Sequence, residues 1–337
     1  MWFLNNQRDL PWRKTQNPYY IWLSEIILQQ TRIQQGWSYY LKFIKHYPTV
    51  QDLASASEDE VLKDWQGLGY YSRARNLHFS AQYICNQLNG IFPQTYKDLL
   101  ELKGVGDYTA SAIASICFNE KAAVVDGNVY RVLSRYFNID TPINSSQGIK
   151  YFKQLAQQLI EKANPGVYNQ ALMDFGAMIC KPQNPDCKSC PLKDSCLALA
   201  SNTIANLPVK LKKIKIQHRY LNFIVFENCD GKTFLEKRTD KGIWKNLYQF
   251  PLIESSNFIE EEGVLASKLL SNKKVKNIFL QYPKPILHKL THQNLHINFW
   301  RIEIDTLNEA NWIHWSETKK FAVPKPIEDF LNQTLEK

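Results

Sequence analysis

The sequence contains no long apolar run. No apolar stretch approaches the roughly 20 residues of a membrane-spanning helix, and the opening MWFLNNQRDLPWR has no charged-then-apolar leader. These absences argue against a membrane-spanning or exported protein. We therefore expect a soluble, cytoplasmic protein.

The sequence also lacks the even cysteine spacing of a disulfide framework. Of its seven cysteines, Cys85, Cys117 and Cys229 stand alone, and four crowd into residues 180–196. An odd number placed so unevenly is not typical of secreted, disulfide-bonded domains. We interpret the three isolated cysteines as small buried hydrophobic residues.

Acidic residues are outnumbered, with 32 Asp plus Glu against 41 Lys plus Arg and a formal charge of +9. Such an excess often marks a surface that binds polyanions, of which nucleic acid is favoured here over a membrane surface. A basic protein with no specialised surface is the alternative. The 337 residues, 44% of them hydrophobic, are enough for a buried core and for two domains.

Helical spacing of apolar residues from 17 to 200 predicts an all-α region. Asn17 with Pro18 predicts a helix start, and Ser57 with Glu60 forms a capping box. Further helices are expected over residues 71–88, 95–102, 107–118, 129–137, 146–162 and 165–178.

After the basic stretch PVKLKKIKIQHR, the spacing of apolar residues changes from helical to alternating. The basic stretch itself suits a linker that can also contact phosphate. Strands are expected in YLNFIVFE, TFLEKR and HINFWRIEI, with a hairpin turn at residues 229–232. Helices are expected over residues 258–270 and in PIEDFLNQTL. We thus expect an all-α domain over residues 1–205, a basic linker over 206–218 and an α+β domain over 219–337.

Two glycines lie one residue apart in LKGVGDYTASA, where one helix ends and another begins. The first N–H groups of the new helix would be unpaired, and such a helix start can bind phosphate. A tight turn without a ligand is the alternative.

Glu25 is the one charged residue in the apolar helix YYIWLSEIILQQT. Burial should raise its pKa and keep it protonated near neutrality, and a protonated acid can donate its proton in catalysis. A buried glutamate held by hydrogen bonds is the alternative. Asp126 precedes a helix that Asn128 or Val129 opens, which it can cap. If Glu25 lies nearby, Asp126 can instead face developing positive charge.

The four clustered cysteines leave six, two and five residues between successive members. They are Cys180, Cys187, Cys190 and Cys196. Thiolates this close predict a metal site, and one compact series favours a cubane iron–sulfur cluster over zinc, which more commonly uses two Cys-x-x-Cys pairs. Three lysines lie between these ligands, at 181, 188 and 193, so we expect a structural cluster that shapes a basic surface.

The helix with Glu25, the glycine turn, the segment with Asp126 and the cysteine series follow one another in the chain. In this order and with this cysteine spacing, residues 8–200 resemble the helix-hairpin-helix DNA glycosylases that carry an iron–sulfur cluster. That group contains lyases similar to endonuclease III and the adenine glycosylases of the MutY family, which remove adenine mispaired with 8-oxoguanine. The lyases carry a lysine where this sequence has Tyr108, because a Schiff base requires an amine. RDLPWR, SEIILQQT and GLGYYSRARNL follow the adenine-specific pattern.

The resemblance implies roles for individual residues. Glu25 would protonate adenine, Asp126 would stabilise the cationic sugar, and Tyr108 and Asn128 would lie beside them. Gln170 stands where the family usually has a glutamate. The other residues expected to contact DNA or the flipped base are Trp12, Arg13, Gln30, Thr31, Leu68, Tyr70, Gly104, Gly106 and Gln170 itself.

The segment GIWKNLYQFPLIE resembles the domain, related to nucleotide-pyrophosphate (Nudix) hydrolases, that reads 8-oxoguanine in the MutY family. No Arg-Glu-x-x-Glu-Glu cluster follows it to bind magnesium, so we expect this domain to bind rather than cut. HKLTHQNLHI fits the recognition loop, with Thr291 and His292 as readers and Leu290 in place of the usual phenylalanine.

The sequence therefore predicts an all-α helix-hairpin-helix glycosylase region with a 4Fe-4S cluster loop, followed by an α+β Nudix-like domain. The expected reaction is the removal of adenine opposite 8-oxoguanine or guanine in double-stranded DNA, by base flipping and acid-catalysed hydrolysis that leaves an abasic site. We expect a monomer, associated with the nucleoid in a bacterium. The alternatives are a bifunctional glycosylase and lyase acting on oxidised pyrimidines, a non-catalytic lesion-binding module, and a zinc-dependent binding protein.

Overall fold

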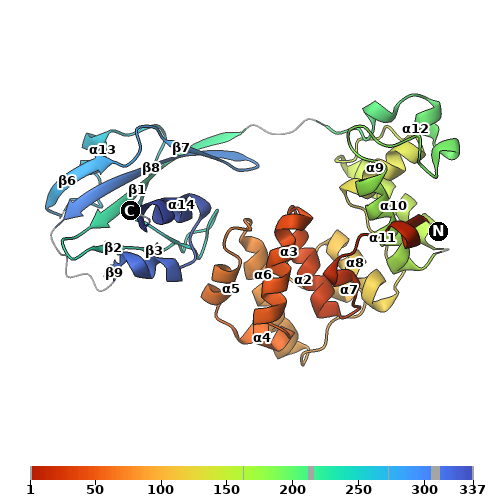
Figure 1. The fold of residues 1–337 in the computed structure, drawn as a ribbon, viewed down its shortest axis with the longest axis horizontal. Helices are drawn as coiled ribbons and strands as arrows, with labels where there is room; N and C mark the ends of the chain where they lie inside the picture. Colours follow the sequence, from red (N-terminus) through yellow and green to blue (C-terminus); the bar gives the residue numbers. More distant parts are fainter. Residues whose placement is uncertain (1, 162, 212–215, 272, 305–311, 336–337) are drawn as a thin grey trace. The chain divides into compact units, whose positions relative to one another are not determined.

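The computed structural model describes residues 2–161, 163–211, 216–271, 273–304 and 312–335 (Figure 1). The chain forms two compact units, Met1–Ala56 with Asn76–Lys212, and Ser57–Arg75 with Lys213–Lys337. The limits 205 and 219 expected for the two domains remain a prediction, and residues 212–215 of the expected linker lie outside the described residues.

The first unit is helical, as the sequence predicts (Figure 1). Its α-helices are α1 (Trp2–Asn6), α2 (Pro18–Leu28), α3 (Ile33–His46), α4 (Val50–Ser55), α6 (Ser72–Gln87, whose first turn is assigned to the second unit), α7 (Tyr96–Leu99), α8 (Asp107–Phe118), α9 (Gly127–Tyr136), α10 (Ser146–Ile160), α11 (Pro165–Met178) and α12 (Leu197–Ala200). Short 3-10 turns are η1 (Pro11–Arg13), η2 (Lys193–Ser195) and η3 (Ile204–Asn206).

Helix α2 begins and packs as its sequence predicts. The Asn17 side chain accepts a hydrogen bond from the backbone N–H of Tyr19 at 2.9 Å, and Pro18 is the first helical residue. Every residue from Ile21 to Ile27 is buried, including Glu25. The helix therefore carries a carboxyl group into the interior of the unit.

Two contacts of α11 place the start of α9. A Cβ atom on Gly176 of α11 would lie 2.6 Å from Cβ of Asn128, so the two segments approach more closely than a larger residue allows. Asn169 of α11 accepts a hydrogen bond from Val124 N at 3.0 Å and donates one to Ala122 O at 2.9 Å. The segment that leads to Asp126 is thereby tied to α11.

The second unit combines α5 (Glu58–Asp64) with a β-sheet and further helices. The capping box expected at Ser57 and Glu60 begins α5. The strands are β1 (Gln217–Glu227), β2 (Lys232–Phe234), β3 (Glu236–Lys237), β4 (Tyr248–Gln249), β5 (Leu252–Ser255), β6 (Val275–Leu280), β7 (Ile286–Lys289), β8 (Gln293–Ile304) and β9 (Trp312–His314). The helical segments are α13 (Glu261–Leu265), η4 (Trp315–Lys320) and α14 (Lys325–Leu335).

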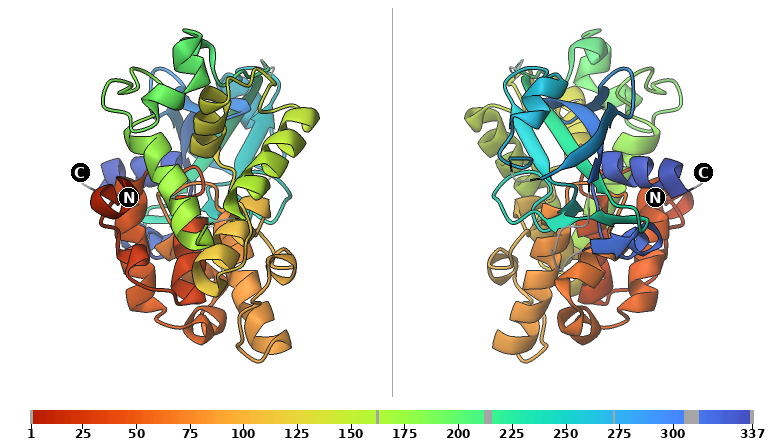
Figure 2. Two further views of the ribbon diagram at one scale, coloured as in Figure 1. Left: turned by 90° about the vertical axis from the view of Figure 1, so that its right-hand side faces the viewer. Right: turned by 90° about the vertical axis from the view of Figure 1, so that its left-hand side faces the viewer.

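The sheet is mixed, with the order β6-β8-β1-β2-β9 and with β5 and β7 paired to β1 and β8. The long strands β1 and β8 run parallel, with Phe223 opposite Phe299, and the other pairs are antiparallel. The strands and α14, coloured green to dark blue, can be followed from two sides in Figure 2.

Both faces of the sheet are covered. Phe223 of β1 and Phe299 of β8 belong to a core that includes Phe330 of α14. Ile224 of β1 belongs to a second core, with Val264 of α13. Because both faces are buried, β1 is a nearly continuous apolar run rather than a strict alternation.

Two expectations for this unit are wrong. The helix expected over residues 258–270 covers only Glu261–Leu265; it has no side-chain N-cap bond, and Gly263 in its middle has low helix propensity. Cys229, expected to be buried, is exposed because it lies in the turn between β1 and β2. Within the described parts of the chain, every helix is too short or too polar to cross a membrane.

Candidate active site

A cavity of about 200 Å³ in the first unit brings together many of the residues expected in the active site. It is lined by the four expected catalytic residues, Glu25, Tyr108, Asp126 and Asn128. Four of the expected base-binding residues also line it, namely Trp12, Arg13, Thr31 and Gln170. The wall is completed by Arg8, Leu10, Ile21, Leu28, Ile33, Ile116 and Met173.

Glu25 is held in the form expected of an acid. Its side chain comes from the buried helix α2, and the residue is 9% exposed. Burial is the main cause that raises the pKa of Glu25 to about 7, and the charge of Asp126 adds to it. A hydrogen bond from Tyr108 and the charge of Arg13 act in the opposite direction. Near neutral pH, a substantial fraction of Glu25 can therefore donate a proton.

Asp126 caps α9 and also lines the cavity. Its Oδ1 accepts hydrogen bonds from the backbone N–H groups of Asn128 at 2.9 Å and Val129 at 2.7 Å, and its Oδ2 accepts one from Nδ2 of Asn128 at 2.7 Å. Capping and a role in the cavity are thus compatible. Glu25 lines the same cavity, which is the condition under which Asp126 can face a developing positive charge. The three donors fix the direction of the carboxylate.

Tyr108 supplies a neutral hydroxyl group to this cavity. Burial, followed by the charges of Glu25 and Asp126, raises the pKa of Tyr108 well above its ordinary value. The hydroxyl donates a hydrogen bond to Sδ of Met173 at 3.5 Å, and it also interacts with the carboxyl group of Glu25. None of the residues that the structure shows lining the cavity is a lysine, so these side chains offer no amine for a Schiff base.

An ion cluster behind the cavity was missed from the sequence. Arg13 and Arg8 both bind the carboxylate of Asp174, which is completely buried in α11. A signal for it existed: Asp174 is a lone charge in the apolar run ALMDFGAM, the same pattern that identified Glu25. Trp12, by contrast, is 6% exposed and packs against Tyr40, so it belongs to the core as well as to the cavity wall.

The glycines of the helix-hairpin-helix segment lie outside the cavity. Gly104 has a φ of +86°, and a Cβ there would lie 2.8 Å from Cβ of Asn76, so the turn requires glycine. Gly106 is the N-cap of α8, and a Cβ on it would meet nothing within 4 Å. The start of α8 is therefore open to a ligand. Gln30 also lies outside the cavity, exposed after the end of α2, with a φ of +56°.

A second cavity, of about 490 Å³, lies within the second unit. It is lined by the four remaining expected residues, Leu68, Tyr70, Thr291 and His292. The hydroxyl groups of Tyr70 and Thr291 are hydrogen-bonded at 2.9 Å. Leu290, which replaces a usual phenylalanine, is partly buried against the sheet core and also lines this cavity.

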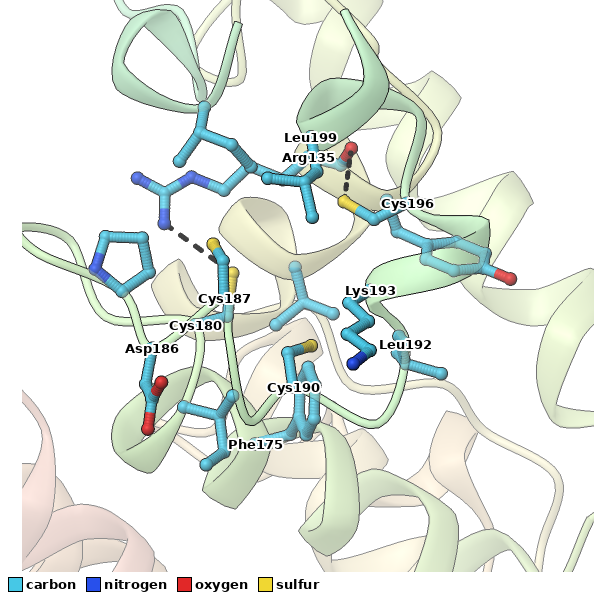
Figure 3. A pocket seen from close by; sticks show the side chains of 15 residues that line it. Arg135, Phe175, Cys180, Asp186, Cys187, Cys190, Leu192, Lys193, Cys196 and Leu199 are labelled. Atoms are coloured by element: carbon cyan, nitrogen blue, oxygen red, sulfur yellow. Dashed lines mark hydrogen bonds between the residues drawn. The ribbon is translucent and has the colours of Figure 1, made fainter. Parts of the chain in front are cut away.

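The four clustered cysteines line a third, small cavity in the first unit (Figure 3). All four are free thiols. Arg135 donates a hydrogen bond to Sγ of Cys180, and Sγ of Cys196 donates one to the Arg135 carbonyl, each at 3.6 Å. The three lysines of these loops are exposed.

Four cysteine thiols are a donor set that both a zinc ion and an iron–sulfur cluster use. Zinc holds its four thiolates at about 2.3 Å, which draws the sulfur atoms together. Across the described ranges, no three Cys, His, Asp or Glu side chains form a group that could hold one ion. Four thiols around a shared cavity fit the donor set of a multi-iron cluster.

Comparison with known proteins places both units in known families. Residues 23–158 match the model of the HhH-GPD superfamily base excision DNA repair proteins, and residues 222–333 match that of the NUDIX domain. A solved thermostable thymine-DNA glycosylase is 34% identical over 59% of this chain and 92% of its own, with a TM-score of 0.55. An endonuclease III–DNA complex, 24% identical with a TM-score of 0.52 over 60% of this chain and 91% of its own, shares the fold.

Curated relatives extend over nearly the whole chain. The adenine DNA glycosylase of Buchnera aphidicola subsp. Baizongia pistaciae is 36% identical over 97% of this chain and 92% of its own length. The adenine DNA glycosylase of Rattus norvegicus is 33% identical over 96% of this chain and 74% of its own. With similarity of this extent, the chain belongs to the family of adenine DNA glycosylases.

Proposed function

We propose that this protein removes adenine from double-stranded DNA in which adenine is mispaired with 8-oxoguanine or guanine. One observation carries the proposal: a buried carboxyl group with a pKa of about 7 and a carboxylate fixed by three N–H donors line the same cavity. A leaving base needs a proton and the sugar left behind needs a negative charge, and this pair supplies both.

The reaction begins with the rotation of adenine out of the duplex, because a base stacked inside the duplex cannot reach Glu25 in the cavity. Flipping costs a few kcal/mol, and less at a mispair. Trp12, Arg13 and Gln170 line the cavity and would contact the flipped base. The open start of α8, at Gly104 and Gly106, would bind a DNA phosphate through its N–H groups and offset part of that cost.

Bond cleavage then divides between the two carboxyl groups. Glu25 gives its proton to a ring nitrogen of adenine, so the electron pair of the glycosidic bond leaves on a neutral base. Asp126, held by Asn128, faces the cationic sugar and stabilises it. Water adds to the sugar carbon and loses a proton, which leaves an abasic site. Tyr108 lies beside this pair, where its neutral hydroxyl group would help to orient Glu25.

The second cavity supplies a site for the base opposite adenine. Gln30 and Tyr70 would enter the base stack around the oxidised guanine, with Leu68 and Thr31 close by. Thr291 and His292 would read the oxidised guanine. In support, four of these residues line one cavity, and Tyr70 and Thr291 are hydrogen-bonded to each other. We further propose that the protein acts as a monomer, since one chain supplies every one of these residues, and that in a bacterium it associates with the nucleoid.

The residues that would hold a 4Fe-4S cluster are Cys180, Cys187, Cys190 and Cys196. When bound, the cluster would crosslink the loop between α11 and α12 and hold the exposed Lys181, Lys188 and Lys193 as a basic surface. The catalytic residues of the first cavity do not include any of these ligands.

One assay tests the proposed function directly. The protein is incubated with duplexes that contain adenine opposite 8-oxoguanine, adenine opposite guanine, or thymine glycol, with and without alkali. We expect free adenine from the first two duplexes and strand cleavage after alkali alone. Cleavage without alkali, with an adduct trapped by borohydride, or release of thymine glycol in place of adenine, would contradict the proposal and support the lyase alternative.

A further inference from the structure

A buried carboxylate that the reaction scheme does not use lies behind the first cavity. Asp174 of α11 has no exposed surface. Its Oδ1 accepts hydrogen bonds from Nη2 of Arg13 at 2.8 Å and from Nε of Arg8 at 2.7 Å, and its Oδ2 accepts one from Nη1 of Arg13. The backbone N–H of Arg8 also donates to Oδ2, at 3.3 Å. Both arginines line the cavity that contains Glu25.

Asp174 is an ionised partner for these arginines. Burial alone raises the pKa of Asp174, but the hydrogen bonds and charges of Arg13 and Arg8 outweigh it, so the pKa lies below its ordinary value. Arg13 meets the carboxylate through two terminal nitrogens, a geometry that fixes the direction of the guanidinium group as well as its position. The side chain of Arg13 is only 10% exposed, so water cannot replace this partner.

The charges around Glu25 balance in this arrangement. Arg8 and Arg13 bring two positive charges from the segment before α2, and the carboxylates of Asp126 and Asp174 bring two negative ones. From α8, Tyr108 and Cys117 face Glu25 as neutral groups, because burial raises the pKa of each. Arg13 already lowers the pKa of Glu25 while it is bound to Asp174. An Arg13 without that partner would act on Glu25 more strongly.

We propose that Asp174 is a positioning residue of this active site. Its carboxylate fixes the guanidinium groups of Arg8 and Arg13 at the cavity wall and matches their charge, so that Glu25 keeps its proton until adenine arrives. The inference rests on the proposed role of Glu25 as the acid. Without Asp174, the positive charge of Arg13 has no carboxylate partner in α11 and acts more strongly on Glu25. An opposite charge within about 4–6 Å lowers a carboxyl pKa by about 1–3 units.

The test is the single-turnover rate of adenine release as a function of pH. In the wild type, the rate should fall as the pH rises through the Glu25 pKa of about 7. Asp174→Asn should move the midpoint of this fall to lower pH by about one unit or more. Arg13→Gln removes the positive charge that lowers the pKa of Glu25 and should move the midpoint to higher pH. The double variant Asp174→Asn with Arg13→Gln should return it toward the wild-type value. Asp174→Glu, which restores the charge, should keep the wild-type midpoint.

A matched control is Asp140→Asn, because Asp140 is an exposed aspartate of the same unit and does not line the cavity. It should leave the profile unchanged. A midpoint of Asp174→Asn equal to that of the wild type, with only the plateau rate reduced, would show a purely structural role and overturn the proposal. If Asp174→Asn does not fold, Arg13→Gln decides: a midpoint equal to that of the wild type overturns the proposal.

Failure of this inference differs from failure of the proposed function. If Glu25→Gln retains the full rate, the assignment of the acid is wrong. If Glu25→Gln is inactive and the wild-type midpoint lies near 7, but none of the charge variants moves it, only the role of Asp174 is wrong.

Discussion

The Glu25→Gln variant isolates the proton that the proposed reaction requires. Glutamine has nearly the shape of a protonated glutamic acid and keeps a hydrogen-bond donor, but it does not release a proton to a leaving base. General acid catalysis contributes about 10²–10⁴-fold to a rate, equivalent to about 3–5 kcal/mol of activation free energy. We therefore expect the single-turnover rate of adenine release to fall by this factor while binding to the mispaired duplex is retained.

The same substitution has a calculable effect on stability. In the unfolded chain Glu25 ionises at its ordinary value of 4.5, whereas burial raises its folded pKa to about 7. Below the unfolded value both states are protonated, and Glu25 has no net effect on stability. As the pH rises from 4.5 to about 7, the unfolded chain loses this proton before the folded state does, and the loss is complete above the folded pKa. The folded state is then destabilised by about 3 kcal/mol relative to the unfolded state, because one pKa unit corresponds to about 1.4 kcal/mol.

Glu25→Gln removes that loss. Its free energy of unfolding, measured by urea denaturation, should match the wild type in acid and exceed it above neutral pH by about 3 kcal/mol. Glu101→Gln, at an exposed glutamate of the same unit, serves as the control and should change neither rate nor stability. A fully active Glu25→Gln enzyme, or one that is less stable than the wild type at alkaline pH, would refute the reasoning.

Three further predictions concern the other residues of the two cavities and the cysteine cluster. Asp126→Asn keeps an oxygen that can cap α9, so the fold should persist while adenine release falls by about 10²-fold or more; a rate close to wild type in a kinetic assay would contradict the role of the charge. Thr291→Ala removes a partner of Tyr70 and should lower the ratio of rates for 8-oxoguanine over guanine opposite adenine, whereas Thr239→Ala, at an exposed threonine that does not line the cavity, should not. Cys190→Ser should lose iron and sulfide in elemental analysis, whereas Cys85→Ser, outside the cluster, should retain both; zinc without iron in the wild type would exclude an iron–sulfur cluster.

Much of the helical unit follows from local signals in the sequence. The limits of α8 and α11 agree with those expected, because glycine at Gly106 and proline at Pro165 begin these helices with well-defined local geometry. Glu25 was identified because a lone charge in an apolar helix must be buried with it. Such signals act within a few residues, which is why they are readable in a single sequence.

Other features depend on contacts between distant segments. The local sequence patterns did not show that Asp126 shares a cavity with Glu25, which only the family resemblance implied. That proximity depends on contacts such as the close approach of α11 to α9 at Gly176. Asp174 has the same local pattern as Glu25, but its importance comes from Arg8 and Arg13, which are distant in sequence. The helix expected over 258–270 was too long because the apolar pattern continues past the point where the backbone leaves the helix.

The central claim is that Glu25 is protonated in its cavity near neutral pH. Proteins labelled with ¹³C at the glutamate side-chain carboxyl carbon, wild type and Glu25→Gln, allow the Glu25 signal to be assigned by its loss and followed by NMR during a pH titration. The account predicts a midpoint of about 7 for that signal. A midpoint near the ordinary value of 4.5 would show an ionised Glu25 at neutral pH and would contradict the claim.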